Sequence, residues 1–130
     1  MPEWTSNDGW ILMSLFLVHR ETGAELYEII SAADATNHAI PTAQELSQAL
    51  TRFATCGLVA FDGRRYLITS EFLPGIRKAY EGRGGLFASA EKGLKWLRRS
   101  KLTDGPEVRI ELSDTDVEAA CLQNIATLNE

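Results

Sequence analysis

The chain has 130 residues, of which 45% are hydrophobic and 24% are charged, and its formal net charge is −5. This is the composition of one ordinary soluble domain that can bury a core without a disulfide or a metal, which excludes disordered and fibrous chains. The longest apolar run, residues 10–18, is shorter than the roughly 20 residues of a membrane-spanning helix, and no Lys or Arg precedes it, so we expect no membrane partner, no secretory signal and a cytoplasmic location.

Two helices are predicted in the first forty residues. Asn7 or Asp8 can cap the first, and its run 10–18 is apolar nearly all the way round, which is typical of a helix enclosed in a core. The second is expected to begin at a capping box formed by Thr22 and Glu25. Its apolar residues follow the spacing of one helical face: Leu26, Ile29, Ile30 and Ala33. Residues 35–39 are then a short connector.

A third helix is predicted over residues 42–56. Thr42 and Glu45 form a second capping box, and Gly57 suits the left-handed residue that ends a helix. Its predicted buried stripe is Leu46, Ala49, Leu50 and Phe53. The side chains left for solvent or a partner are polar and nearly uncharged: Gln44, Ser47, Gln48, Thr51, Arg52 and Thr55.

A β-hairpin is predicted after the third helix. Two β-prone runs, residues 58–61 and 64–69, flank the pair Asp62-Gly63. Asp-Gly between such runs is typical of a two-residue type I′ turn, because both turn positions need positive φ. The hairpin would present Arg64 and Arg65 at its tip.

The remainder is predicted as two helices, a strand and a final helix. Thr69 or Ser70 can cap a fourth helix that contains Pro74 and ends before the glycine-rich residues 82–85. A fifth, at residues 86–101, places Leu86, Ala90, Leu94 and Leu97 on one side and Lys92, Lys95 and Arg99 on another. Residues 107–112 alternate as a half-buried strand, which needs the hairpin or a second copy as partner. Ser113 or Asp114 can cap a last helix with the apolar stripe Val117, Cys121, Ile125 and Leu128.

Charge is distributed unevenly along the chain. Residues 1–51 hold one basic residue against seven acidic ones, and residues 102–130 hold the same numbers. Residues 52–101 hold eleven basic residues against four acidic ones. Either the basic middle meets an anion, or the acidic ends fold over it and neutralise it. The fifth helix carries a basic stripe with one indole: Lys92, Lys95, Arg98, Arg99 and Lys101, with Trp96. This stripe can lie on a membrane surface, follow a phosphate backbone or simply be the solvated side of a packed helix.

The order of three helices, a glycine terminus and a tight hairpin resembles the winged helix-turn-helix domain of transcriptional regulators. The resemblance rests on the start of the third helix at residues 40–50, its end and the first strand at 50–59, and the turn and returning strand at 62–69. It covers residues 8 to about 80. The fold class it implies is mainly α with a small β-hairpin, a winged helix-turn-helix at residues 1–81 with a C-terminal helical extension at residues 82–130.

The family resemblance implies binding of double-stranded DNA and a role in transcription regulation. A recognition helix lies in the major groove with its early residues at base edges, and a wing contacts the backbone or the minor groove. The matching positions in this chain are Thr42, Gln44, Ser47, Gln48, Thr51 and Arg52 on the helix, and Arg64 and Arg65 on the wing. The connector before this helix is longer than the usual turn, and the helix face carries a single Arg.

No catalytic or metal-binding pattern is found in the sequence. His19 and His38 have no neighbours in the sequence that suggest a metal site. Cys56 and Cys121 form no CxxC pair, so both cysteines are expected to be buried thiols in a reducing compartment. No Ser lies in a GxSxG motif and no glycine loop is followed by the Lys-Ser/Thr of a nucleotide site. We therefore expect no enzyme, no cofactor and no metal.

Two functional hypotheses remain open. The first is a DNA-binding winged-helix protein, dimeric if the strand 107–112 and the last helix form a seam, as the family favours, and monomeric if they complete the core on the first helix. The second is a winged-helix protein-interaction module that binds a protein through its acidic surfaces and last helix. A continuous positive face over the third helix and wing favours DNA; bordering carboxylates of Glu21, Glu25, Glu28 or Asp34 favour the interaction module.

Overall fold

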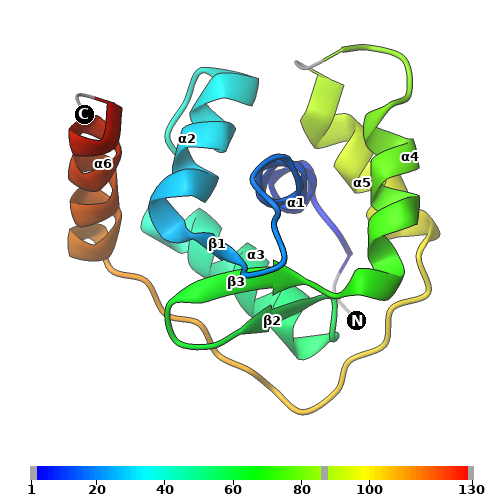
Figure 1. Ribbon diagram of the computed structural model, residues 1–130. Helices are drawn as coiled ribbons and strands as arrows, with labels where there is room; N and C mark the ends of the chain where they lie inside the picture. The colour runs from blue at the N-terminus through cyan, green and yellow to red at the C-terminus, as the bar shows by residue number, and fades with distance from the viewer. Residues whose placement is uncertain (1–2, 86–87, 129–130) are drawn as a thin grey trace.

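The computed structural model describes residues 3–85 and 88–128. It is mainly helical with a small three-stranded antiparallel sheet, which confirms the predicted fold class (Figure 1). Along the chain, the elements are α1 (Ser6–Leu17), β1 (Ala24–Glu25), α2 (Leu26–Asn37), α3 (Ala43–Thr55), β2 (Val59–Phe61), β3 (Arg65–Ile68), a 3₁₀ turn η1 (Ser70–Phe72), α4 (Leu73–Tyr80), α5 (Ser89–Arg99) and α6 (Asp114–Leu128).

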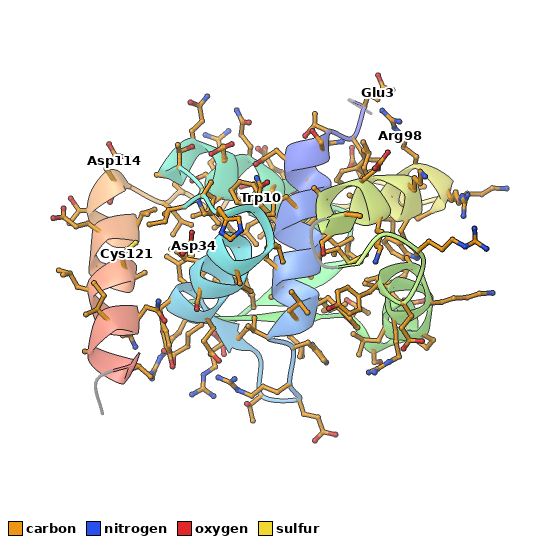
Figure 2. All side chains as sticks on the ribbon, turned by 90° about the horizontal axis from the view of Figure 1, so that it is seen from above. Glu3, Trp10, Asp34, Arg98, Asp114 and Cys121 are labelled. Atoms are coloured by element: carbon orange, nitrogen blue, oxygen red, sulfur yellow. The ribbon has the colours of Figure 1, made fainter. Side chains whose placement is uncertain are left out.

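Helix α1 is the centre of the fold. It is buried along its length, as its apolar run predicts, and it packs against α2, α3, α4 and α5. The expected cap was wrong: Thr5 caps the helix and shares reciprocal hydrogen bonds with Asp8 at the third helical position. Trp10 lies between α1 and α2, where its indole Nε1 donates to the carbonyl of Ala33 and the hydroxyl of Thr36 (Figure 2).

The second helix begins later than predicted. Ala24 and Glu25 form the short strand β1, which pairs with β3, so the sheet order is β1-β3-β2. Helix α2 then starts at Leu26, capped by a box between Glu25 and Glu28 rather than between Thr22 and Glu25. Pairing with β3 holds Ala24 and Glu25 in extended conformation and so overrides the local capping pattern.

The hairpin of β2 and β3 is present, but its turn differs from the predicted one. The Asp62 amide donates to the Arg65 carbonyl, so the chain reverses at Gly63 and Arg64, one residue later than expected. Gly63 has a φ of +99°, whereas Asp62 is not in the left-handed region, so the turn is not type I′. The Asp62 carboxylate instead accepts hydrogen bonds from the Arg64 and Arg65 amides.

The two C-terminal helices lie at opposite ends of the molecule. Helix α5 packs against α1 and α4, and α6 packs against α2, with α1 between the two ends (Figure 1). Leu97 of α5 is fully buried, while Leu86 lies outside the described residues. Helix α6 is capped by Ser113, one of the two predicted caps, through reciprocal bonds with Asp116. It contacts α2 rather than α1, and Leu122 and Ile125 remain exposed.

Residues 107–113, called the strap from here on, connect the two ends. We expected residues 107–112 to pair as a strand with the hairpin or with another copy, and the pairing with the hairpin was wrong. The strap joins no sheet and runs along α3 instead. The predicted alternation holds from Arg109 to Leu112, because Ile110 is buried and Leu112 is half-buried while Arg109 and Glu111 are exposed. Val108, which was expected on the buried face, is exposed instead.

Candidate nucleic-acid interface

Helix α3 forms as the sequence predicts. The Thr42 hydroxyl accepts from the Glu45 amide at 3.1 Å, and the Glu45 carboxylate accepts from the Thr42 amide at 2.9 Å. Gly57 follows the helix with a φ of +78°. Gln44 and Gln48, two of the candidate base-reading residues, are exposed on this helix.

The outward face of α3 holds the strap through three hydroxyl groups. Each hydroxyl accepts the amide N–H of one strap residue and donates to the carbonyl of the same residue. Ser47 pairs with Leu112 at 2.9 and 3.3 Å, and Thr51 pairs with Ile110 at 2.9 and 3.0 Å. Thr55 pairs with Val108 at 3.1 and 3.3 Å. Six hydrogen bonds therefore connect α3 to the strap.

The spacing of these pairs follows from helix and strand geometry. Four residues of helix advance by about 6.0 Å, and two residues of extended chain advance by about 6.6 Å. Hydroxyls at positions 47, 51 and 55 therefore stay in register with the backbone of every second strap residue. The strap covers two of the candidate base-reading residues, Ser47 and Thr51.

Arg52 is held by the N-terminal segment. Its guanidinium lies 2.8 Å from the Asp8 carboxylate, donates to the Glu3 carbonyl at 3.2 Å and lies over the Trp4 ring, 3.9 Å from the centroid. Asp8 is buried, so this ion pair is well shielded from solvent. The candidate phosphate contact is thus engaged inside the fold.

The hairpin arginines are also partly neutralised. Arg64 lies 2.9 Å from Glu25, one of the carboxylates that we named as favouring an interaction module. Arg65 is half-buried, and its Nε has no hydrogen-bond partner among the described residues. Hydrogen bonds from the Arg65 and Arg64 amides lower the pKa of Asp62, which keeps a negative charge at the turn.

The strap adds carboxylates above α3. Glu107 and Glu111 are exposed, and both lie near Arg109, whose guanidinium is 3.3 Å from the first and 3.4 Å from the second. The three side chains leave a net negative charge over the face where a phosphate backbone would approach. The eight candidate residues are therefore not brought together as one positive surface.

A groove that borders the hairpin, α2 and α6 is acidic and aromatic. It has a volume of about 390 Å³, and its lining carries the carboxylates of Glu25, Glu111 and Asp116 and the cation of Arg64. Phe61 and Tyr66 stack here with their ring centroids 4.5 Å apart. Burial, and then the charge of Asp116, raise the pKa of Tyr66 to about 12.

The strongest cationic surface lies instead on α4 and α5. Residues 73–101 contain eight basic and two acidic residues, and this end of the molecule carries many exposed nitrogen-tipped side chains (Figure 2). The sequence singled out the α5 stripe, but it did not indicate that Lys78 and Arg83 face it across a groove. One expectation for this stripe was wrong: Lys92 is buried, and its Nζ donates to the carbonyls of Tyr80 and Gly85.

The remaining groups that could carry chemistry are the potential metal ligands, His19 and Cys56. In the ranges 3–85 and 88–128, no cluster of three or more potential ligands could hold a metal ion. Burial, and then the nearby Arg77, lower the pKa of His19. Burial raises the pKa of the Cys56 thiol, which keeps it protonated at neutral pH.

The chain was compared with protein families, with curated proteins and with solved structures. No protein-family model, no curated protein and no solved structure matches the chain. Across the described part of the chain, no helix has the length and apolarity that a membrane crossing requires.

Proposed function

We propose that this chain is a winged-helix protein-interaction module that binds a basic protein segment and does not read duplex DNA with α3. The order of α1, α2, α3 and the β2–β3 hairpin supports the winged-helix resemblance. The capping box of α3 and the glycine at its end support it further. These features support the fold alone, and whether the partner is protein or DNA depends on the charges and contacts of the surface.

The observation that carries the proposal is the strap on α3. Insertion of α3 into a major groove requires the strap to leave, because Ser47, Thr51 and Thr55 cannot bind it and contact bases at the same time. Departure would break six hydrogen bonds and expose Ile110, which is 4% exposed. The surface that faces a ligand with the strap in place carries carboxylates, which repel phosphates.

The acidic groove between the hairpin and α6 supports a cationic partner. Carboxylates of Glu25, Glu111 and Asp116 line it together with the aromatic side chains of Tyr27 and Phe61. Arg64 also lines it and pairs with Glu25, so three carboxylates stand against one cation and the groove keeps a net negative charge. A Lys or Arg side chain can place its alkyl stem against such rings while its charged group meets a carboxylate. The partner that fits this surface is therefore a flexible protein segment rich in Lys or Arg.

A binding experiment with the full chain tests this proposal. The probe is a fluorescent oligo-arginine peptide, and Glu111→Gln should weaken its binding about fivefold, since one charge-assisted contact is lost. Glu91→Gln, which makes the same change of charge on α5 at the other end of the molecule, is the control and should change binding less than about twofold. Equal effects of the two variants would contradict a site at the strap.

Titration with duplex DNA tests the alternative, in which α3 reads DNA. Binding of a mixed duplex that is lost in both Gln48→Ala and Arg64→Ala would place DNA on α3 and the hairpin, and would overturn the proposal. We expect neither variant to change the affinity for duplex measured at low salt.

A further inference from the structure

The groove between α4 and α5 is a strongly cationic hollow. It has a volume of about 550 Å³, within the range of small-molecule sites. Four exposed cations and one buried cation line it, beside an indole ring and the small residues that open it: Lys78, Arg83, Lys95, Arg99, Lys92, Trp96, Gly75, Ala79 and Gly82.

No carboxylate lines this groove. Glu81 and Glu91 are the two acidic residues of the 73–101 segment, and neither is part of the lining. Within the described residues, no carboxylate lies at ion-pair distance from Lys78, Arg83, Lys95 or Arg99. Cations gathered without counterions repel one another, and an anion in the groove relieves that repulsion.

The shape of the groove is fixed by packing below it. A Cβ on Gly75 would lie 2.9 Å from the Trp96 Nε1, so the absent side chain lets the indole lie directly against α4. The Lys92 ammonium ties Tyr80, the last residue of α4, to Gly85 in the glycine-rich turn at 2.8 and 3.0 Å. Burial of the Lys92 stem and its two carbonyl partners therefore holds the two walls together before any ligand arrives.

Helix α5 is itself anchored to the core. A Cβ added to Gly93 would lie 2.3 Å from the Gly9 carbonyl oxygen, so α1 and α5 cross with their backbones in contact. Leu97 is fully buried on the same helix. The groove is consequently built on a rigid element of the domain, which favours a defined binding site over a mobile charged tail.

We propose that this groove binds the phosphate groups of a nucleotide, either free or within a single strand. Lys and Arg donate charge-assisted hydrogen bonds to phosphate oxygens, and Arg does so with two parallel donors. Trp96 in the lining supplies a ring against which a base can stack. An acidic peptide would use the cations but not the ring, so the aromatic wall favours a nucleotide. The site is separate from the acidic groove of the proposed function and does not depend on it.

The test is titration of the full chain with ATP and with a short oligothymidine strand at low and moderate salt. We expect binding that weakens with salt, and about tenfold weaker binding in Lys95→Glu and in Arg99→Glu, because each removes a charged contact. Binding of ATP alone would assign a free nucleotide, and binding of the strand alone would assign a polymer; both support the groove.

Arg98→Glu is the matched control. Arg98 lies on the same helix and undergoes the same change of charge, but it points toward Glu3, 3.7 Å away, and is not part of the groove (Figure 2). This variant should weaken binding less than about threefold. Equal losses in Lys95→Glu and Arg98→Glu would show a general electrostatic field rather than a site.

Two further outcomes would overturn the proposal. One is the absence of binding to both probes at low salt. The other is binding of a poly-glutamate peptide as tight as that of the strand, which would make the groove a peptide site. All three variants change exposed residues, so their thermal unfolding should match that of the parent chain and confirm that a loss of binding is not a loss of fold.

Discussion

The face of α3 and the groove of α4 and α5 are both polar surfaces on helices, but they differ in how far the chain itself supplies partners for their polar groups. The first consists of hydroxyls that bind the backbone of the strap. The second consists of cations, of which the buried Lys92 alone binds backbone carbonyls within residues 3–85 and 88–128. A neutral hydroxyl can both donate to a carbonyl and accept from an amide of any extended segment, whereas a group of cations needs an anion to balance its charge. The comparison shows that the α3 hydroxyls are satisfied by the chain's own backbone, whereas the exposed cations of the groove have no carboxylate at ion-pair distance among the described residues.

The largest effect is expected where the basic end joins the core. Gly93→Ala places a methyl group 2.3 Å from the Gly9 carbonyl oxygen, and the two backbones must separate. We expect it to lower the free energy of unfolding by about 3 kcal/mol, measured by urea denaturation. Gly82→Ala is the control, with its nearest atom 3.2 Å away, and should cost less than about 1 kcal/mol. Similar stability of both variants would mean that α5 is not anchored at this crossing.

The next effect separates the buried middle of the strap from its exposed beginning. Ile110→Ala removes a side chain that is 4% exposed and should lower the free energy of unfolding by about 3 kcal/mol. Val108→Ala, two residues earlier and 41% exposed, should cost less than about 0.5 kcal/mol. The pair sharpens the comparison, since equal effects would contradict a strap whose buried anchor is Ile110.

A smaller effect isolates the hydroxyl contacts. Thr51→Val keeps the shape of the side chain but leaves the Ile110 amide and carbonyl without their partner. We expect a loss of about 2 kcal/mol in unfolding free energy. Thr115→Val, at an exposed position of α6, should change it by less than about 0.5 kcal/mol. An unchanged stability of Thr51→Val would show that these hydrogen bonds do not hold the strap.

The smallest effect concerns the pH dependence of the acidic end. Tyr66 has a pKa of about 12 in the fold because burial disfavours the phenolate, and an unfolded tyrosine titrates near 10. Its contribution to stability is therefore complete below pH 10 and is lost as the pH rises through 12. Absorbance titration should show one late tyrosine step that is absent in Tyr66→Phe. Loss of that step in Asp62→Asn but not in Tyr66→Phe would contradict the assignment.

Local signals predicted most of the fold. The box of Thr42 and Glu45, the glycine at 57 and the alternation of residues 107–112 each depend on neighbours in sequence, and the structure has a helix, a helix end and a one-sided extended segment there. Strand β1 escaped prediction because two residues carry no periodicity, and their strand character comes from pairing with β3.

The surface was less predictable because it depends on contacts between distant segments. The strap meets α3 across more than fifty residues of sequence, and Arg52 meets Asp8 across 44. A signal for the first contact was present: hydroxyl residues at positions 47, 51 and 55 match alternate positions of an extended segment. Nothing local indicated that Lys78 and Arg83 face Lys95 across a groove, because their approach follows from the packing of α4 on α5.

Amide hydrogen exchange of the strap tests the central claim, that α3 is closed by its own chain, most directly. The amides of Val108, Ile110 and Leu112 donate to hydroxyls on α3. Successive amides of an extended chain alternate in direction, so those of Arg109 and Glu111 are expected to point away from α3. The account predicts slow exchange at the first three residues and fast exchange at the other two, resolved residue by residue by NMR. Uniformly fast exchange across all five amides would contradict it and would leave α3 open to a ligand.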